Sequence, residues 1–449
     1  MNAPTLAALA TALAQGASSS RALVEECLAH IDDPAGEGQR TFLQVEREGA
    51  LAQADAVDAL RACGAAPSAY AGIPISIKDL FDIAGQTTRA GSVALMHRPA
   101  ATADATAVAR LRQAGLILIG RTNMTEFAFS GLGLNPHYGT PLNPWNRPAR
   151  HIPGGSSSGA AVSVTDAMAH AAIGTDTGGS CRIPAAFTGL VGFKPSARRV
   201  PRDGMIPLSS SLDSIGPIAR SVGCCALLDA LLAGEPLPDW EPLTHARLRF
   251  AIPRTVVLDN MDRHVAAAFA SSTARLINAG IHIEELDAPE FAELPVINAN
   301  GSLVSAESYA WHRAWLPAYA STYDPRVLSR IEAGAAQSAA DYIGLLEARS
   351  RFIARVNQRI AGFDAWLMPT VPVIAPKLSD LALDAAYYRT NTLVLRNSAI
   401  VNFLDGCAIS IPIHDPGTAP VGLTLFHRNG QDRHLFRCAA AAETLLQRG

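Results

Sequence analysis

Residues 154–182 read Gly154-Gly-Ser-Ser-Ser-Gly159, then an alanine-rich segment, then Gly174-Thr-Asp-Thr-Gly-Gly-Ser-Cys-Arg182. Two Gly-Gly-Ser turns on either side of a small-residue helix are an unusual way to build a core. Chains place glycine where the backbone must approach another group closely or adopt a positive φ. We therefore expect the chemistry of this protein to lie in this part of the chain.

Helical and strand patterns alternate around residues 139–220, a region that interrupts the alternation. The strand-like run Ile73–Ile77, the helical Ala105–Gln113 and the run Leu116–Ile119 form a β-α-β pattern. Further strands are predicted at Leu248–Ile252, Ile281–Glu284, Ala365–Met368, Ala408–Ile413 and Val421–Phe426. Helices are predicted after Ser18–Ser20 and over Ala50–Arg61, 264–278, 303–319, 339–361 and 433–447.

The size of the chain predicts a large buried core. It has 449 residues, of which 49% are hydrophobic, and length alone would allow about three domains. The stretch Gly234–Thr244 is the best candidate for a linker, but the strands after it would most economically join the same sheet. We therefore expect one α/β unit over residues 1–449, with a helical insertion around 258–364.

The charge and the cysteine content of the chain indicate which binding partners and which cellular compartment to expect. The net charge is -3 and no block of like charges occurs, so we expect neither direct nucleic-acid binding nor a polybasic membrane patch. The seven cysteines form no Cys-x-x-Cys pair, which is typical of a reducing compartment. The apolar stretch Leu6–Ala14 precedes the first basic residue, Arg21, and no run of 18 apolar residues occurs. These features predict a cytoplasmic protein without a membrane span.

Two interpretations of the glycine-rich stretch fail on the residues around it. A phosphate-binding loop needs Gly-x-x-x-x-Gly-Lys-Ser/Thr or Gly-x-Gly-x-x-Gly, and neither occurs. The elbow of an α/β-hydrolase formally matches Gly155-Ser-Ser-Ser-Gly159, but that elbow needs a strand directly before it. Asn143–Pro153 precedes it here and contains three prolines, which a central strand does not tolerate.

Metal-assisted hydrolysis is also disfavoured. The chain has 12 histidines, yet no His-x-x-x-His pair occurs, and His137, His151 and His170 are scattered. Ordinary surface or hydrogen-bonded histidines explain them better. We therefore expect no metal.

A nucleophilic serine without a histidine base fits the stretch better. Ser180 ends Thr177-Gly-Gly-Ser180, where backbone N–H groups can converge on one oxygen, as an oxyanion hole requires. Such a serine needs a base. Lys78 ends the apolar run Gly72–Ile77, and burial favours the neutral amine that accepts a proton. Each feature alone is more often structural, but together they favour catalysis.

Together these residues resemble the amidase signature family. The matching motifs are Gly154–Gly159, Gly174–Ser180, Arg182–Phe187, Gly189–Pro195, Gly72–Asp79, Arg121–Phe127 and Ser211–Arg220. The resemblance is specific over about residues 72–220 and weaker elsewhere. It implies an α/β fold with a single large mixed β-sheet core that is flanked by helices on both faces.

The resemblance also implies a Ser-cisSer-Lys triad. In this chain Ser180 would be the nucleophile, Ser156 the bridging hydroxyl and Lys78 the general base, with a cis peptide between Gly155 and Ser156. The implied oxyanion hole consists of the backbone N–H groups of Thr177, Gly178, Gly179 and Ser180. Ala128 would lie near the bound acyl group, and no cofactor is implied.

Four residues near the nucleophile need a separate interpretation. We interpret Asp176 and Arg182 as charges that orient the turn rather than as catalytic groups. Ala160 follows the serine run where the family often has Ser or Gly, which should be harmless. Cys181 stands where an aliphatic or small residue is common, and its thiol is a rival nucleophile without a partnered histidine nearby.

The leading hypothesis is a cofactor-free amidase that hydrolyses the C–N bond of a carboxylic amide to a carboxylate plus ammonia or an amine, through an acyl-enzyme on Ser180. Two alternatives are the glutamine-hydrolysing A-type subunit of a tRNA-dependent amidotransferase and a specialised ureido- or carboxybiuret-type amide hydrolase. The intact Lys78, Ser156 and Ser180 disfavour an inactive binding subunit. The expected partner is a small-molecule amide, and a homodimer or a small partner subunit is compatible with the sequence.

The motifs do not specify the substrate pocket. We expect it to be lined from residues 290–400, where the candidates are Tyr309, Trp311, Tyr387, Tyr388, Arg389 and Arg396. Two arginines can clamp a carboxylate, although surface arginines are the simpler interpretation of Arg389 and Arg396.

Overall fold

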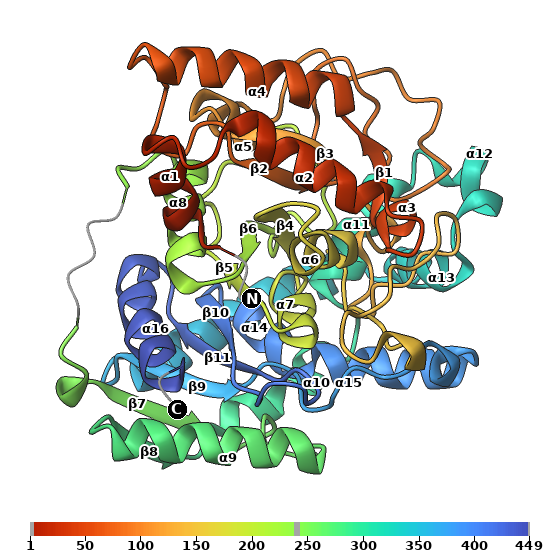
Figure 1. Ribbon diagram of the computed structural model, residues 1–449. Helices are drawn as coiled ribbons and strands as arrows, with labels where there is room; N and C mark the ends of the chain where they lie inside the picture. The colour runs from red at the N-terminus through yellow and green to blue at the C-terminus, as the bar shows by residue number, and fades with distance from the viewer. Residues whose placement is uncertain (1–3, 238–242, 448–449) are drawn as a thin grey trace.

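The structure is a computed structural model that describes residues 4–237 and 243–447. Its strands are β1 Phe42–Val45, β2 Pro74–Lys78, β3 Ile117–Thr122, β4 Ala172–Asp176, β5 Val191–Lys194, β6 Ser214–Ala219, β7 Arg249–Pro253, β8 His282–Leu286, β9 Ala365–Pro369, β10 Cys407–Pro412 and β11 Gly422–His427. They form one sheet in the order β1-β3-β2-β4-β6-β5-β10-β11-β9-β7-β8 (Figure 1). β2 is parallel to β3 and β4, and β7 is parallel to β8 and β9. The other neighbours are antiparallel, so the mixed sheet that the resemblance implied is confirmed.

Helices cover both faces of this sheet. They are α1 Leu6–Ala14, α2 Ser20–Asp32, α3 Gly38–Thr41, α4 Arg47–Ala62, α5 Thr106–Gln113, α6 Ser158–Thr165, α7 Arg182–Thr188, α8 Val222–Ala233, α9 Arg263–Asn278, α10 Leu294–Ile297, α11 Leu303–His312, α12 Leu316–Tyr319, α13 Pro325–Glu332, α14 Ala339–Ile360, α15 Asp384–Phe403 and α16 Asp432–Gln447. β2 shows how the faces divide, because successive strand residues point to opposite sides. Ile75 and Ile77 belong to the core that includes α5 and α8 residues, whereas the Ser76 hydroxyl lies 2.8 Å from that of Ser163 in α6.

The predicted β-α-β unit is β2-α5-β3, whose two strands are parallel neighbours. All strands after residue 243 join the same sheet, as the sequence predicted. Residues 238–242 of the predicted linker Gly234–Thr244 lie outside the described residues.

The region 139–220, which interrupts the alternation of helical and strand patterns in the sequence, contributes strands that were not predicted from the sequence. It supplies β4, β5 and β6, which lie in the middle of the strand order. The glycines in these strands make them hard to recognise in the sequence, because glycine is normally unfavourable in strands. A Cβ at Gly216 would lie 2.0 Å from the Phe193 carbonyl oxygen, and one at Gly192 would lie 2.5 Å from that of Cys181. Close backbone packing therefore imposes residues of low strand propensity at these positions.

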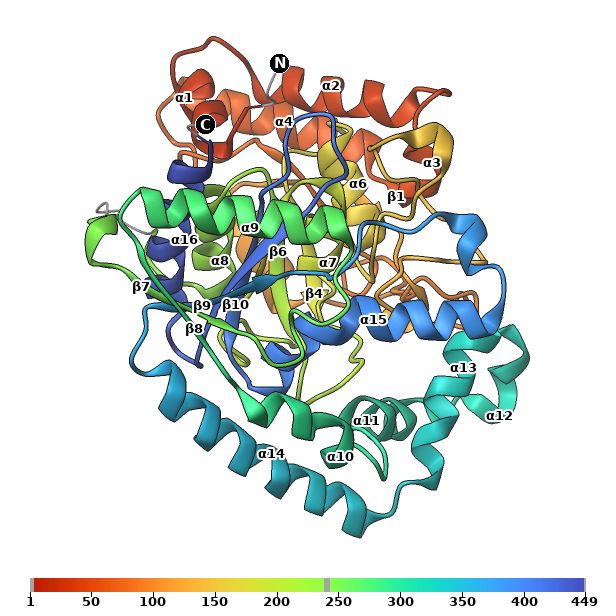
Figure 2. The ribbon, with the colours of Figure 1, turned by 90° about the horizontal axis from the view of Figure 1, so that it is seen from below.

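The chain between β8 and β9 is helical in the structure. The single helix predicted over 303–319 is divided into α11 and α12, with Pro317 in the first turn of α12. α10, α11, α13 and α14 form an arc beside α15, at one side of the sheet (Figure 2). The predicted insertion around 258–364 also contains α9 and the sheet strand β8, and its boundaries, like the single-domain assignment, remain a prediction.

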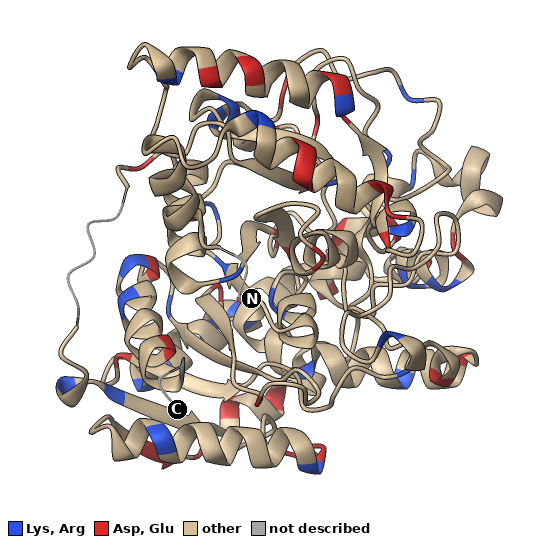
Figure 3. Ribbon diagram, in the orientation of Figure 1, with Lys and Arg blue, Asp and Glu red and all other residues tan. Residues whose placement is uncertain are grey.

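Charged residues of both signs share the outer helices, for example α2 and α4 (Figure 3). All seven cysteines are unpaired, and all except Cys63 are buried. In the described part of the chain, no helix combines the length and apolar character that a membrane crossing requires.

Candidate active site

Lys78 lies at the carboxyl end of β2, beside the parallel strand β4. Its Nζ donates hydrogen bonds to Ser156 Oγ and to Thr175 Oγ1, both at 2.7 Å. Lys78 and Ser156 are completely buried. Burial lowers the pKa of Lys78 from its ordinary value to about 8, because desolvation penalises the ammonium form. About a tenth of the molecules therefore carry the neutral amine at pH 7.

Ser156 is presented by a turn that packs backbone against backbone. The Gly155–Ser156 peptide is cis. The Gly155 N–H donates to the Gly131 carbonyl, and a Cβ at Gly155 would lie only 2.5 Å from the Gly133 nitrogen. Glycine is therefore required where this turn meets residues 131–133, and the contact fixes Ser156 opposite Lys78.

The turn after β4 carries Ser180 and touches the Ser156 turn through the Ser157 N–H, which donates to the Ser180 carbonyl at 3.3 Å. The Gly179 N–H donates to Asp176 Oδ1 at 2.8 Å. Thr177, Gly178 and Ser180 line the adjacent pocket, whereas Gly179 is not among its lining residues. Gly179 is one of the four expected oxyanion donors, but its N–H group already donates to the Asp176 carboxylate.

Gly179 instead allows the turn to lie against α15. Its φ is 128°, and a Cβ there would lie 2.2 Å from Ser398 Oγ. Ser398 in turn donates a hydrogen bond to the Gly178 carbonyl at 2.7 Å. A side chain at position 179 would thus both strain the backbone and displace the residue that anchors the turn.

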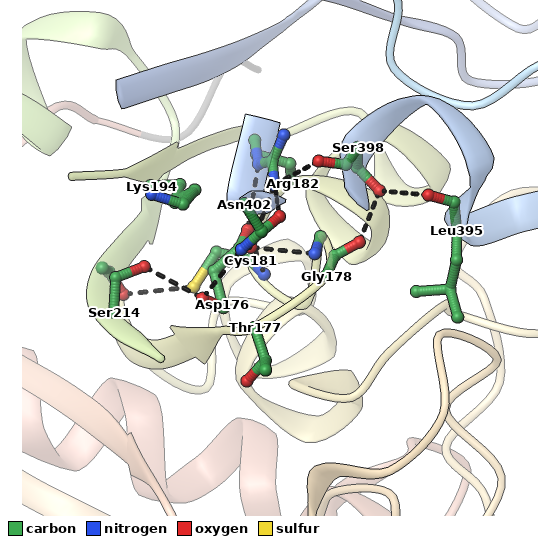
Figure 4. A network of polar contacts seen from close by, with 12 residues as sticks. Asp176, Thr177, Gly178, Cys181, Arg182, Lys194, Ser214, Leu395, Ser398 and Asn402 are labelled. Carbon is green, nitrogen blue, oxygen red and sulfur yellow. Dashed lines mark hydrogen bonds and ion pairs between the residues drawn. The ribbon is translucent and has the colours of Figure 1, made fainter. Parts of the chain in front are cut away.

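A buried ion pair supports the same turn (Figure 4). Arg182 donates to both oxygens of Asp176 at 3.0 Å, and the Asn402 side-chain amide donates to Asp176 Oδ1 at 2.9 Å. Burial alone would raise the pKa of Asp176, but the Arg182 guanidinium and these hydrogen bonds hold that pKa well below its usual range. The carboxylate stays ionised and keeps the turn in place. Sequence reasoning missed Ser398 and Asn402, because they lie on α15, far along the chain.

Replacing Arg182 with methionine should lower the free energy of unfolding by about 3–5 kcal/mol, because Asp176 would remain as an unpaired buried charge. Urea-induced unfolding measures this effect. The control is Arg355→Met in the half-exposed Arg355–Glu293 pair, which should cost less than about 1 kcal/mol. Equal costs for the two variants would contradict the role assigned to Arg182.

Thr177 is held by a second buried carboxylate. Its hydroxyl donates to Asp213 at 2.5 Å, and Asp213 also accepts the Leu208 and Ser209 N–H groups at 3.0 Å. Burial raises the pKa of Asp213 to about 6. Asp213 lies in the motif Ser211–Arg220, which pointed to the family without revealing this contact.

The Cys181 thiol is a poor rival to Ser180. It is completely buried and donates to the Gly216 carbonyl at 3.5 Å. Burial raises the pKa of this thiol far above its ordinary value, so the reactive thiolate form is suppressed.

A cavity of about 800 Å³ opens in front of Ser180. Ala128, expected near the acyl group, lines it, whereas Lys78 and Ser156 are not lining residues. Most of its walls are apolar: Phe129, Leu208, Leu212, Val256, Phe291, Leu294, Leu303, Val304, Leu395, Ile400 and Phe403. Of the six candidates taken from residues 290–400, Arg396 lines the cavity. Arg330 does so as well, and sequence reasoning missed it because no motif surrounds it.

The profile of the Amidase family matches residues 22–436. The chain belongs to the amidase signature family. Members of this family are hydrolases that act on carbon–nitrogen bonds, and the sequence similarity extends over nearly the whole of this chain.

Individual relatives of this amidase chain cover different shares of it. It is 35% identical to the 2-amino-5-chloromuconic acid deaminase of Comamonas testosteroni, over 95% of this chain and 93% of that protein. It is 41% identical to the A-type subunit of a glutamyl-tRNA(Gln) amidotransferase from Pseudomonas putida, over 64% of this chain and 62% of that protein. The crystal structure of an amidase covers 99% of this chain and is itself covered completely, with a TM-score of 0.88 at 30% identity.

Proposed function

We propose that the protein is an amidase that converts a carboxylic amide and water into a carboxylate and ammonia or an amine, with Ser180 as the nucleophile. The observation that carries this proposal is the buried 2.7 Å contact between Lys78 Nζ and Ser156 Oγ, behind a cavity that Ser180 lines. A base, a relay hydroxyl and an accessible nucleophile are the parts that serine-based acyl transfer requires.

Acylation uses the neutral amine of Lys78. The amine takes the proton of the Ser156 hydroxyl, Ser156 takes that of Ser180, and Ser180 Oγ attacks the amide carbon. The negative oxygen that forms is stabilised by backbone N–H groups of Thr177, Gly178 and Ser180 in the pocket wall. The C–N bond then breaks as the leaving nitrogen receives a proton back through Ser156.

Deacylation repeats the proton relay with water. A water molecule attacks the ester on Ser180 after transferring a proton toward Lys78, and the C–O bond to Ser180 breaks. The products are the free carboxylate and the regenerated serine hydroxyl. The buried positions of Lys78 and Ser156 favour this order, because only Ser180 of the three lines the cavity.

Ammonia release from a panel of primary amides, followed by mass spectrometry of denaturant-quenched protein, tests the proposal. An acyl adduct on the peptide that contains Ser180 is expected. An adduct on Cys181, or turnover by a protein that lacks Ser180, would disprove the assignment.

Ammonia supply to an amidotransferase is a second candidate function. Similarity to amidotransferase A-type subunits favours it. The Pseudomonas putida protein matches about two thirds of this chain, and the Mycobacteroides abscessus protein matches 98% of it at 33% identity. Glutamine hydrolysis that depends on a tRNA-binding partner would identify this function. The deaminase matches this chain almost from end to end as well, so coverage does not separate the two candidates.

Chelation should leave turnover unchanged. In this mechanism Lys78 and Ser156 carry out the proton transfers, and within residues 4–237 and 243–447 no group of three or more His, Cys, Asp or Glu side chains is arranged to hold a metal ion. The measurement is amide hydrolysis after prolonged dialysis against EDTA. Lost activity that added zinc restores would refute this expectation.

A further inference from the structure

The cavity in front of Ser180 combines apolar walls with two cationic side chains. Arg330, on α13, and Arg396, on α15, both line it. The remaining polar lining consists of uncharged groups such as Ser130 and Asn298, and the lining includes no Asp or Glu among the described residues. The cavity therefore carries positive charge with no negative charge in its own wall.

Neither arginine has a carboxylate in direct contact among the described residues, although Asp259 interacts electrostatically with Arg396. Arg330 stacks over the Phe129 ring, with 4.3 Å between guanidinium carbon and ring centroid, and donates to the Phe129 carbonyl. Arg396 donates to Asn397 Oδ1 at 3.0 Å and to the Val257 carbonyl at 3.3 Å. Neither forms a salt bridge within the described part of the chain. Both remain cationic, because guanidinium keeps its proton even where burial lowers its pKa.

Shielded arginines elsewhere in this protein have two kinds of partner: Arg220 and Arg349, which are partly buried, donate to the carbonyls of Val164 and Phe403, whereas others pair with an acid. Arg121, Arg182 and Arg199 each pair with a carboxylate. An unpaired cation in an apolar wall is unfavourable unless an anion arrives with the ligand, since apolar surroundings do not replace the lost hydration. Arginine also suits carboxylates because its N–H groups match the two oxygens.

We infer that the substrate is an amide whose acyl part is a long apolar chain or ring that ends in a carboxylate, which Arg330 and Arg396 receive. This inference rests on the proposed function and specifies its substrate class. A cavity of about 800 Å³ accommodates such a body. A zwitterionic amino acid such as glutamine fits less well, because no carboxylate in the described lining would receive its ammonium group.

Three primary amides of equal length test the inference by changing only the charge of the far end. They are 8-amino-8-oxooctanoate, with a carboxylate, nonanamide, with a methyl group, and 8-aminooctanamide, with an ammonium group. We expect kcat/KM to be about 10- to 100-fold higher for the carboxylate than for nonanamide. The ammonium compound should be the poorest of the three.

Variants of the arginines identify the source of this preference. Arg396→Met should reduce the carboxylate advantage over nonanamide to about threefold or less. Arg389→Met is the matched control, because Arg389 lies on the same helix, is exposed and does not line the cavity. Arg330→Lys keeps the charge at position 330 and should retain part of the preference, whereas Arg330→Met should lose it. Thermal unfolding of each variant shows whether it is folded.

Binding separates a failure of this inference from a failure of the proposed function. Octanedioate, the product of the first amide, is titrated into Ser180→Ala protein by calorimetry, with and without Arg396→Met. Binding that weakens about tenfold or more with Arg396→Met supports the inference even if no amide is hydrolysed. Equal rates for the three amides in a Ser180-dependent reaction, or octanedioate binding that Arg396→Met leaves unchanged, would overturn it.

Discussion

Ser180→Ala protein should lose amide turnover by about 10⁴-fold or more, because no covalent intermediate can form. Ser156→Ala protein should retain slightly more activity, with a loss of about 10³-fold, since Ser156 relays a proton without bonding to the substrate. Steady-state ammonia release measures both effects. Both hydroxyls are small and buried, so unfolding curves should change little compared with the kinetic loss.

Cys181→Ala is the matched control for the nucleophile, since Cys181 is the next residue in the same turn. We expect it to keep turnover within about threefold of wild type, because burial keeps its thiol protonated. A Ser180→Ala protein with a near-normal rate would overturn the nucleophile assignment. So would a Cys181→Ala protein that is folded but inactive.

The second large effect concerns Lys78. Lys78→Ala should reduce turnover by about 10³-fold or more, because no other described group contacts Ser156 Oγ as a base. Lys78→Arg should do no better, because a guanidinium cannot accept the proton at these pH values. A fully active Lys78→Arg enzyme would mean that another group takes the proton.

The pH profile of the wild type reports the same residue. Burial lowers the pKa of Lys78 to about 8, and the reactive form is the deprotonated one. Activity should therefore rise with increasing pH and level off above the pKa, with about a 50-fold gain in kcat/KM between pH 6 and pH 8. A profile that levels off near pH 6.5 would indicate a histidine base instead.

Asp176, paired with Arg182, and Lys78, the proposed base, need opposite charge states in the same buried region. Asp176 must remain charged to hold the turn, and Arg182 and Asn402 provide the contacts that keep it so. Lys78 must lose its charge to act as a base, and its hydrogen bonds go to the hydroxyl groups of Ser156 and Thr175. Local partners thus separate the protonation states of groups that share one desolvated environment.

Much of the fold followed from local patterns. The β2-α5-β3 unit and the strands after residue 243 were predicted, because their apolar residues repeat with strand or helix spacing. The central strands β4, β5 and β6 were not predicted, because glycine is required at positions 192 and 216 by backbone atoms that pack against them, the carbonyl oxygens of Cys181 and Phe193. Those neighbours are unknown until the sheet is assembled.

Some residues of the candidate site could likewise be predicted from local motifs, whereas others could not. Lys78, Ser156 and Ser180 stand in short motifs, where the glycines and serines needed for two tight turns are contiguous in the chain. Two of the residues that support the Ser180 turn, Ser398 and Asn402, are remote in sequence, since Ser398 contacts Gly178 across 220 residues. No local pattern marks Ser398, because its significance lies only in that contact.

The family, the α/β class and the residues proposed for the chemistry could be inferred from the amino-acid sequence, because tight turns and an apolar strand end are properties of adjacent residues. The side chains that line the cavity in front of Ser180 became known only from the folded arrangement. Arg330 and Arg396 come from α13 and α15 and meet at one cavity, while Arg389, equally eligible from the sequence, lies outside it. A pocket is defined by which surfaces of distant helices are left facing each other after the core has packed, and chain order does not encode this arrangement locally.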